Sequence, residues 1–93
     1  MNNPQFASVW DAIEDTPEEA ENMKLRSSLM IALKAHLHRT GLSQIQAAKL
    51  LGVTPPRVSD LMRGKINLFG LDSLVNMAVA AGLHIELRVT EEM

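Results

Sequence analysis

The chain has 93 residues, of which 46% are hydrophobic, 3% are aromatic and none is cysteine. This length suits one small domain, and the scarcity of aromatic residues means that aliphatic side chains fill its core, which favours packed helices over a β-sandwich. The lack of cysteine excludes disulfides, thiolate metal sites and thiol catalysis. No apolar run approaches the ~20 residues needed to cross a bilayer, so we expect a cytoplasmic protein with no membrane partner.

The charges are unevenly distributed along a chain whose formal net charge is only −2. Residues 1–23 carry six acidic side chains and no basic one, whereas residues 24–70 carry eight basic side chains and one acidic one. Residues 71–93 are again acidic. Because the local field governs attraction to a polyanion, the basic middle suits nucleic acid binding.

Residues 1–15 form the first predicted unit, an acidic N-terminal arm with a short helix. Phe6, Val9 or Trp10, and Ile13 follow near-helical spacing and would share one face. Two interpretations stay open. Either this face covers the core of the domain, or Phe6, Trp10 and Ile13 bind a protein partner with Trp10 as the aromatic anchor.

A long helix is predicted to begin after Thr16 and to end near Arg39. Thr16 and Glu19 match a capping box, Pro17 suits the first helical position, and the following Gly41 is a stop signal. The predicted apolar stripe consists of Met30, Leu33 and Leu37, and Leu29 flanks it. His36 and His38 also lie on this helix, but residues two apart point in different directions, so we expect solvent-facing or partly packed histidines and no metal site.

Residues 41–64, GLSQIQAAKLLGVTPPRVSDLMRG, predict two short helices joined by a tight turn. The first would run from about Ser43, its N-cap, to Leu51, and Gly52 would supply the left-handed turn conformation. The second would start at Thr54, which can cap it, with Pro55 at its first helical position. The residues expected to face inward are Ala47, Ala48, Leu51, Val53, Val58 and Leu61.

A loop over residues 64–67 and one more helix are expected next. Ile66, Leu68 and Phe69 would pin the loop to the core, and the helix would run from Leu71 or Asp72 to Ala81. Its predicted buried stripe is Leu71, Leu74, Val75 and Ala78. Gly82 would end the helix.

Residues 84–90 alternate polar and apolar side chains, a pattern typical of a β-strand, with Ile85, Leu87 and Val89 on one side. No second strand is evident in the sequence, and a lone strand leaves its backbone groups unpaired, so pairing with a second copy in a homodimer is the favoured interpretation. The alternative is a frayed tail that packs Ile85 and Leu87 on the last helix.

The alanine pair, Gly52, Val53, Val58 and Leu61 resemble the helix-turn-helix of XRE (phage-repressor-like) regulators over roughly residues 29–83. The run from Ser43 to Leu87 is most similar to the compact branch found among HigA-type antitoxins. This resemblance implies a lambda-repressor-like fold and a dimeric protein that binds operator DNA, often with a small RelE-like or HigB-like ribonuclease toxin as partner. We expect no cofactor. The expected fold is therefore all-α, with about five helices, a domain over residues 16–83 and a C-terminal strand and tail over residues 84–93.

The same resemblance implies which residues meet DNA. The start of the second helix would enter the major groove with Thr54, Pro55, Pro56, Arg57 and Asp60 near base edges and with Ser59 and Arg63 at the margin. Gln44 resembles the family's phosphate-clamping amide, and Lys65 would reach a phosphate.

Two of these roles stay open, and one position departs from the family. Arg57 would read guanine or only touch phosphate, and Asp60 would accept from cytosine or orient Arg57 or Arg63. Pro55 and Pro56 stand where amide or hydroxyl side chains are common, so DNA shape would carry more of the readout.

Two functions in the same binding class follow from the resemblance. The first is an antitoxin that represses its own operon, and the alternative is a stand-alone, prophage-like repressor with no toxin. We expect no enzyme, because the sequence has no tyrosine, no glycine-rich phosphate loop and no histidine at a useful spacing from a carboxylate. A purely structural interaction module would leave the basic middle unexplained.

Overall fold

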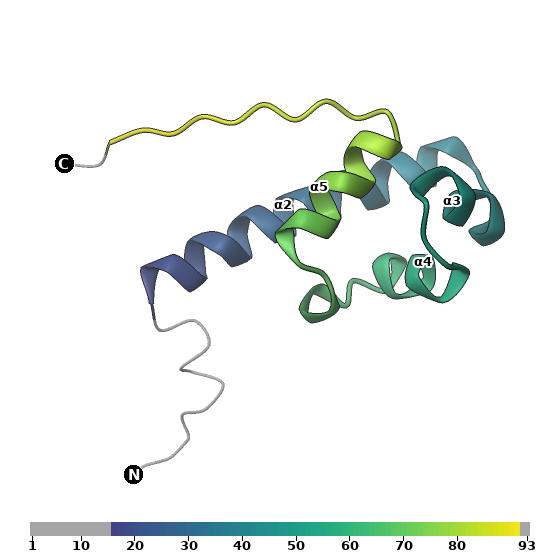
Figure 1. Cartoon of the computed structure of the whole chain (residues 1–93), viewed down its shortest axis with the longest axis horizontal. Coiled ribbons are helices and arrows are strands. Elements are labelled where there is room, and N and C mark those ends of the chain that lie inside the picture. Colours follow the sequence, from purple (N-terminus) through teal and green to yellow (C-terminus); the bar gives the residue numbers. More distant parts are fainter. Residues whose placement is uncertain (1–15, 92–93) are drawn as a thin grey trace, which may run out of the picture.

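The computed structural model describes residues 16–91 as four α-helices, one short 3-10 helix and an extended C-terminal segment (Figure 1). In chain order these elements are α2 (Pro17–Thr40), α3 (Gln44–Leu51), α4 (Pro55–Met62), η1 (Ile66–Leu68) and α5 (Leu71–Ala80). The expected all-α fold is confirmed for these residues, with four α-helices rather than about five. The helix expected within residues 1–15 lies outside the described part of the chain.

Helix α2 begins and ends at the predicted signals. The Thr16 hydroxyl accepts a hydrogen bond from the Glu19 backbone N–H at 3.1 Å, and Pro17 occupies the first turn. At the other end Gly41 adopts φ 70°, a left-handed conformation that glycine tolerates best. With 24 residues the helix is about 36 Å long, and its first turns extend beyond the other helices (Figure 1).

The core lies where α2 packs against α5 and where α3 packs against α4 and α5. Its buried residues are Met30, Leu33, Leu37, Ala47, Ala48, Leu51, Val58, Leu61, Phe69, Leu74, Met77, Ala78 and Ala81. The predicted stripe of α2 is confirmed. The predicted stripe of α5 needs a correction, because Met77 is buried with Leu74 and Ala78 whereas Leu71 and Val75 are only half-buried.

The connection from α4 to α5 is more ordered than the expected loop, because residues 66–68 form the 3-10 helix η1. Phe69 is 1% exposed and Ile66 is half-buried, but Leu68 is 49% exposed. A 3-10 helix has three residues per turn, so three successive side chains point in three directions and cannot all face the core. Ile66 and Phe69 therefore pin this connection, and the prediction for Leu68 was wrong.

The predicted C-terminal strand is not present as such in residues 16–91. After Leu83, whose N–H donates to the Ala78 carbonyl at 2.9 Å, the chain runs extended back along the helices (Figure 1). Ile85 packs against the core, whereas Leu87 is 74% exposed and Val89 is 83% exposed. A strand requires a partner for its backbone groups, and the described part of a single chain offers none.

Two further expectations concern α2 and the membrane. The His36 Nε2 atom lies 3.0 Å from the Ala81 carbonyl oxygen, so His36 is partly packed against the end of α5, as expected.

Between residues 16 and 91 no helix combines the length and the hydropathy that a membrane crossing requires.

Candidate nucleic-acid interface

Helices α3 and α4 form the predicted helix-turn-helix. Gly52 adopts φ 72°, and the Val53 N–H donates to the Ala48 carbonyl at 3.0 Å, which closes the end of α3. Ala47 and Ala48 are each 3% exposed, so their small side chains allow the two helices to approach closely. Val58 and Leu61 bury the inner face of α4. The inward-facing residues predicted for both helices are confirmed.

The start of α3 is fixed by a complete capping box. The Ser43 hydroxyl accepts from the Gln46 N–H at 3.1 Å, and the Gln46 side-chain oxygen accepts from the Ser43 N–H at 3.0 Å. Gln44 and Gln46 are both exposed, but the Gln46 side chain is used in the capping box, so Gln44 is the amide at the helix start that the box does not use. This geometry suits a group that contacts phosphate, the role expected for Gln44.

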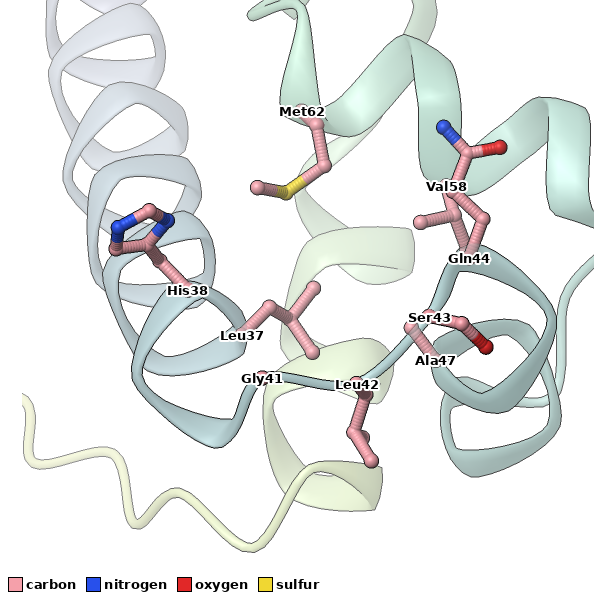
Figure 2. Close-up of a pocket in the computed structure, with 9 residues that line it drawn as sticks. All are labelled: Leu37, His38, Gly41, Leu42, Ser43, Gln44, Ala47, Val58 and Met62. Carbon is pink, nitrogen blue, oxygen red and sulfur yellow. The ribbon is translucent and has the colours of Figure 1, made fainter.

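A cavity of about 350 Å³ opens beside Gln44, between the end of α2, the residue 41–43 connection and α4 (Figure 2). Leu37 points into it from α2 and Met62 points into it from α4 (Figure 2). His38 is the one titratable residue of its lining. Such a lining provides no acid–base pair.

The start of α4 is shaped by two prolines. Thr54 is the N-cap residue, as predicted, but its side chain makes no capping hydrogen bond. A capping side chain accepts from the second or third helical N–H. Here the second helical residue is Pro56, which has no N–H, and the third, Arg57, donates its N–H to the Thr54 carbonyl at 3.0 Å. The Thr54 hydroxyl is therefore left for another partner.

The outer face of α4 carries Pro56, Ser59 and Arg63. These residues are spaced by three and four positions, so they follow one side of the helix, opposite the buried Val58 and Leu61. Pro56 and Arg63 are exposed and Ser59 is half-exposed. We define these three residues as the outer face of α4.

Arg57 does not lie on the outer face of α4. Its position four residues before the buried Leu61 places it on the flank nearest the core. The guanidinium carbon is 4.0 Å from the centroid of the Phe69 ring, and the NH1 group donates to the Leu68 carbonyl at 2.7 Å. Arg57 therefore links α4 to the last residue of η1 and to Phe69, which follows it.

Asp60 pairs with Lys65 rather than with an arginine. The Lys65 Nζ lies 3.8 Å from an Asp60 carboxylate oxygen, and the two side chains are 45% and 29% exposed. A pair this exposed contributes little stability. It does partly offset the charge of Lys65, the residue expected to reach a phosphate.

Several of the basic residues between 24 and 70 are partly buried and contact other parts of the fold, so they are less available to bind DNA. Arg26, Lys34 and Arg57 are partly buried. The Lys34 Nζ lies beside Gly64 at the end of α4, where a β-carbon on Gly64 would be 3.5 Å away, and a cation there also suits the helix dipole. The exposed bases are Lys24, Arg39, Lys49, Arg63 and Lys65. The field available to DNA is thus smaller than the charge count suggests.

Comparison with known proteins identifies the motif. A helix-turn-helix domain family matches residues 12–90 of the chain. A solved structure assigned to the XRE family of transcriptional regulators is 31% identical, with a TM-score of 0.73 over 80% of this chain and 83% of that chain. The chain is an XRE-type helix-turn-helix protein. No curated protein sequence matches it.

The other predicted sites of this XRE-type protein fall outside the α3–α4 unit. Phe6, Trp10 and Ile13 lie outside the described residues. Ile85 and Leu87 line an apolar groove of about 500 Å³ between α2, α5 and the C-terminal segment. Within residues 16–91 no group of three or more histidine, cysteine or acidic side chains is placed to hold a metal ion.

Two features of the interface were not predicted from the sequence. The Ser43–Gln46 capping box has the recognisable spacing of a capping residue followed three positions later by glutamine. The flank position of Arg57 could have been found from its four-residue distance to Leu61. Its contacts with Leu68 and Phe69 carry no local signal, because they join residues eleven and twelve positions away.

Proposed function

We propose that this XRE-type protein is a transcriptional repressor that binds operator DNA by placing α4 in the major groove. Membership of the helix-turn-helix family supports DNA-binding transcription regulation as the class of function. The observation that carries the proposal is the α3–α4 unit, in which Val58 and Leu61 are buried while the outer face of α4, which includes the polar Ser59 and Arg63, is accessible. A helix held in this way is the usual reader of the major groove.

Several contacts with DNA follow from this placement. Ser59 and Arg63 face base edges and the adjoining backbone, while Pro55 and Pro56 offer apolar contact with thymine methyl groups and respond to DNA shape. Thr54 and Gln44 contact phosphates, since the Thr54 hydroxyl makes no cap bond and Gln44 is exposed. Lys65 adds positive charge, and Asp60 moderates it through their ion pair. The protein acts by binding, without catalysis.

A homodimer fits this mode of action. Leu87 and Val89 are large apolar side chains on an extended segment, and both are strongly exposed in the single chain. Pairing of residues 84–90 with a second copy would cover these side chains and satisfy their backbone groups. A two-fold arrangement would also present two α4 helices to two half-sites.

The finer proposal is an antitoxin that represses its own operon. Its support is the acidic N-terminal region, of which Glu18, Glu19 and Glu21 are exposed at the start of α2. An exposed acidic surface suits a basic protein partner such as a RelE-like or HigB-like ribonuclease toxin. The alternative is a stand-alone repressor of prophage type, which needs no such partner.

Two measurements test the proposal. Selection from a random pool of double-stranded oligonucleotides should recover a sequence with two half-sites about 34 Å apart. Recovery of no preferred sequence would contradict DNA-specific binding. Co-expression with the product of the adjacent gene should yield a complex if the protein is an antitoxin. Absence of a complex, with operator binding intact, would favour the stand-alone repressor.

A further inference from the structure

Two arginines from different helices converge on the turn between α4 and α5. From α4, the Arg57 NH1 group donates to the Leu68 carbonyl at 2.7 Å. From α2, the Arg26 NH1 group lies 3.4 Å from the Ile66 carbonyl oxygen and 3.5 Å from that of Phe69. The turn over residues 66–69 is therefore held from two sides by guanidinium groups. Through this turn, Arg57 of α4 and Arg26 of α2 are joined, so the orientation of α4 is tied to the long helix α2.

Phe69 provides the second contact of the Arg57 guanidinium. Its side chain is 1% exposed and is among the largest fully buried side chains of the core. The Arg57 guanidinium lies 4.0 Å from the centroid of this ring, within the range of a cation–π interaction. A guanidinium fixed both by a carbonyl and by a buried ring is a poor candidate for a group that must reach into a DNA groove.

Base reading would require Arg57 to abandon this arrangement. An arginine that reads guanine directs two parallel N–H groups at the two acceptors of that base. One N–H of the Arg57 NH1 group donates to Leu68, the guanidinium lies over the Phe69 ring, and the side chain lies on the flank of α4, not on the outer face. Pro56, Ser59 and Arg63, in contrast, need no rearrangement to face a groove.

We propose that Arg57 is a positioning residue, which sets the orientation of α4 through Leu68 and Phe69, and that base discrimination falls on the outer face of α4. Helix α4 has reason to need such a link. It is eight residues long, and it begins with two prolines and an N-cap side chain that makes no cap bond. The link to Phe69 compensates for this weak start by tying the Arg57 flank of the helix to the core.

This inference rests on the proposed function, and its test uses the duplex that the wild-type protein selects from a random pool. The dissociation constant is measured for that duplex, for every single base-pair substitution of it, and for an unrelated duplex of equal length. If the wild-type protein selects no duplex, DNA-specific binding itself fails. If it does, the inference is tested by Arg57→Ala.

For Arg57→Ala we expect the dissociation constant for the selected duplex to rise at least about tenfold. For each base-pair substitution, the ratio of its dissociation constant to that of the selected duplex should stay as it is in the wild-type protein. A reading arginine would instead lose the preference at one base pair of each half-site and keep the others. That outcome would overturn the inference. Asn67→Ala, in the same turn but with an exposed residue, is the matched control and should bind as wild type does.

A purely structural role is separated by measuring the folded fraction. Binding is compared at a temperature at which circular dichroism shows Arg57→Ala to be folded. If the folded variant binds as tightly as wild type, Arg57 only stabilises the fold, and the inference is wrong. Arg57→Lys keeps the charge but lacks the planar group, and we expect a smaller loss with the same uniform pattern. A base-specific loss in Arg57→Lys would overturn the inference even if Arg57→Ala does not fold.

Discussion

Ser43 and Thr54 occupy equivalent positions, each before an eight-residue helix, yet only Ser43 caps its helix with its side chain. The sequence predicts both as N-caps from residue type and position. The difference arises because Pro56 removes one donor and the Thr54 carbonyl takes the other. The proline pair thus decides what the threonine can do, and it frees a hydroxyl at the start of the proposed reading helix.

This contrast predicts unequal effects on stability. Ser43→Ala should lower the free energy of unfolding by about 1 kcal/mol, because it breaks the capping box. Thr54→Ala should change it by well under 1 kcal/mol, since no cap bond is lost. Urea unfolding monitored by circular dichroism measures both. Equal losses for the two variants would mean that the Thr54 hydroxyl does cap α4.

Arg57 shows where sequence-based reasoning stops at the residue scale. The residue type and the position near the start of a recognition helix both favour a DNA contact. The actual contacts are with Leu68 and Phe69, which reach Arg57 only after the chain has turned through η1. Such a contact depends on tertiary structure and leaves no local pattern.

At the scale of elements, helix ends were the most predictable features and the connections were the least. The bounds of α2, α3 and α5 fall within about two residues of those expected, because capping residues and glycines mark them. The 3-10 helix η1 was missed, since three residues are too few for a periodic pattern. The buried stripe of α5 shifted toward Met77 because neighbouring helices, not periodicity alone, decide which side is covered.

Gly52 offers a test of the turn that joins α3 to α4. A β-carbon at Gly52 meets nothing within 4 Å, and the same holds for Gly70, so steric contact does not distinguish the two sites. They differ in φ, which is 72° at Gly52 and −81° at Gly70. Gly52→Ala should therefore cost about 1–2 kcal/mol of stability from backbone conformation alone.

The comparison is Gly70→Ala, whose φ suits any residue. Because Gly70 is the N-cap of α5, where alanine is less favoured than glycine, the loss should be up to about 0.5–1 kcal/mol and smaller than that of Gly52→Ala. Thermal unfolding of both variants gives the comparison. A Gly70→Ala loss as large as that of Gly52→Ala would show that backbone conformation is not what makes Gly52 necessary.

At the scale of the whole molecule, the sequence predicted the segregation of the charges and the alternating pattern of the C-terminal segment. It did not predict which basic side chains are exposed or what the segment packs against. Three of the eight bases between residues 24 and 70 are partly buried, which no charge count reveals. The tail has the alternation of a strand, yet a strand forms only against a partner. Residues 16–91 of one chain supply no such partner, so the alternation is consistent with the proposed pairing between two copies.

The proposed dimer predicts that Leu87→Asp raises the dimer dissociation constant about tenfold or more while the melting temperature of the helical domain stays nearly unchanged. Leu87 is 74% exposed, so the substitution removes little from the core of one copy. Thr90→Asp adds the same charge to an exposed site in the same segment and is the control. Analytical ultracentrifugation of the wild-type protein, Leu87→Asp and Thr90→Asp measures the three dimer dissociation constants. If Leu87→Asp dimerises as tightly as the wild type, the strand-pairing interface is excluded.

The central claim is that the outer face of α4 meets DNA, and one charge placed there tests it most directly. Ser59→Glu adds a negative charge to that face, and Asn76→Glu adds the same charge to an exposed site on α5. We predict that Ser59→Glu weakens binding of the selected duplex at least tenfold, about 1.4 kcal/mol, because it faces the phosphates, while Asn76→Glu changes it little. Binding titrations of both variants at one fixed salt concentration provide the measurement. Equal dissociation constants for Ser59→Glu and Asn76→Glu would contradict the account.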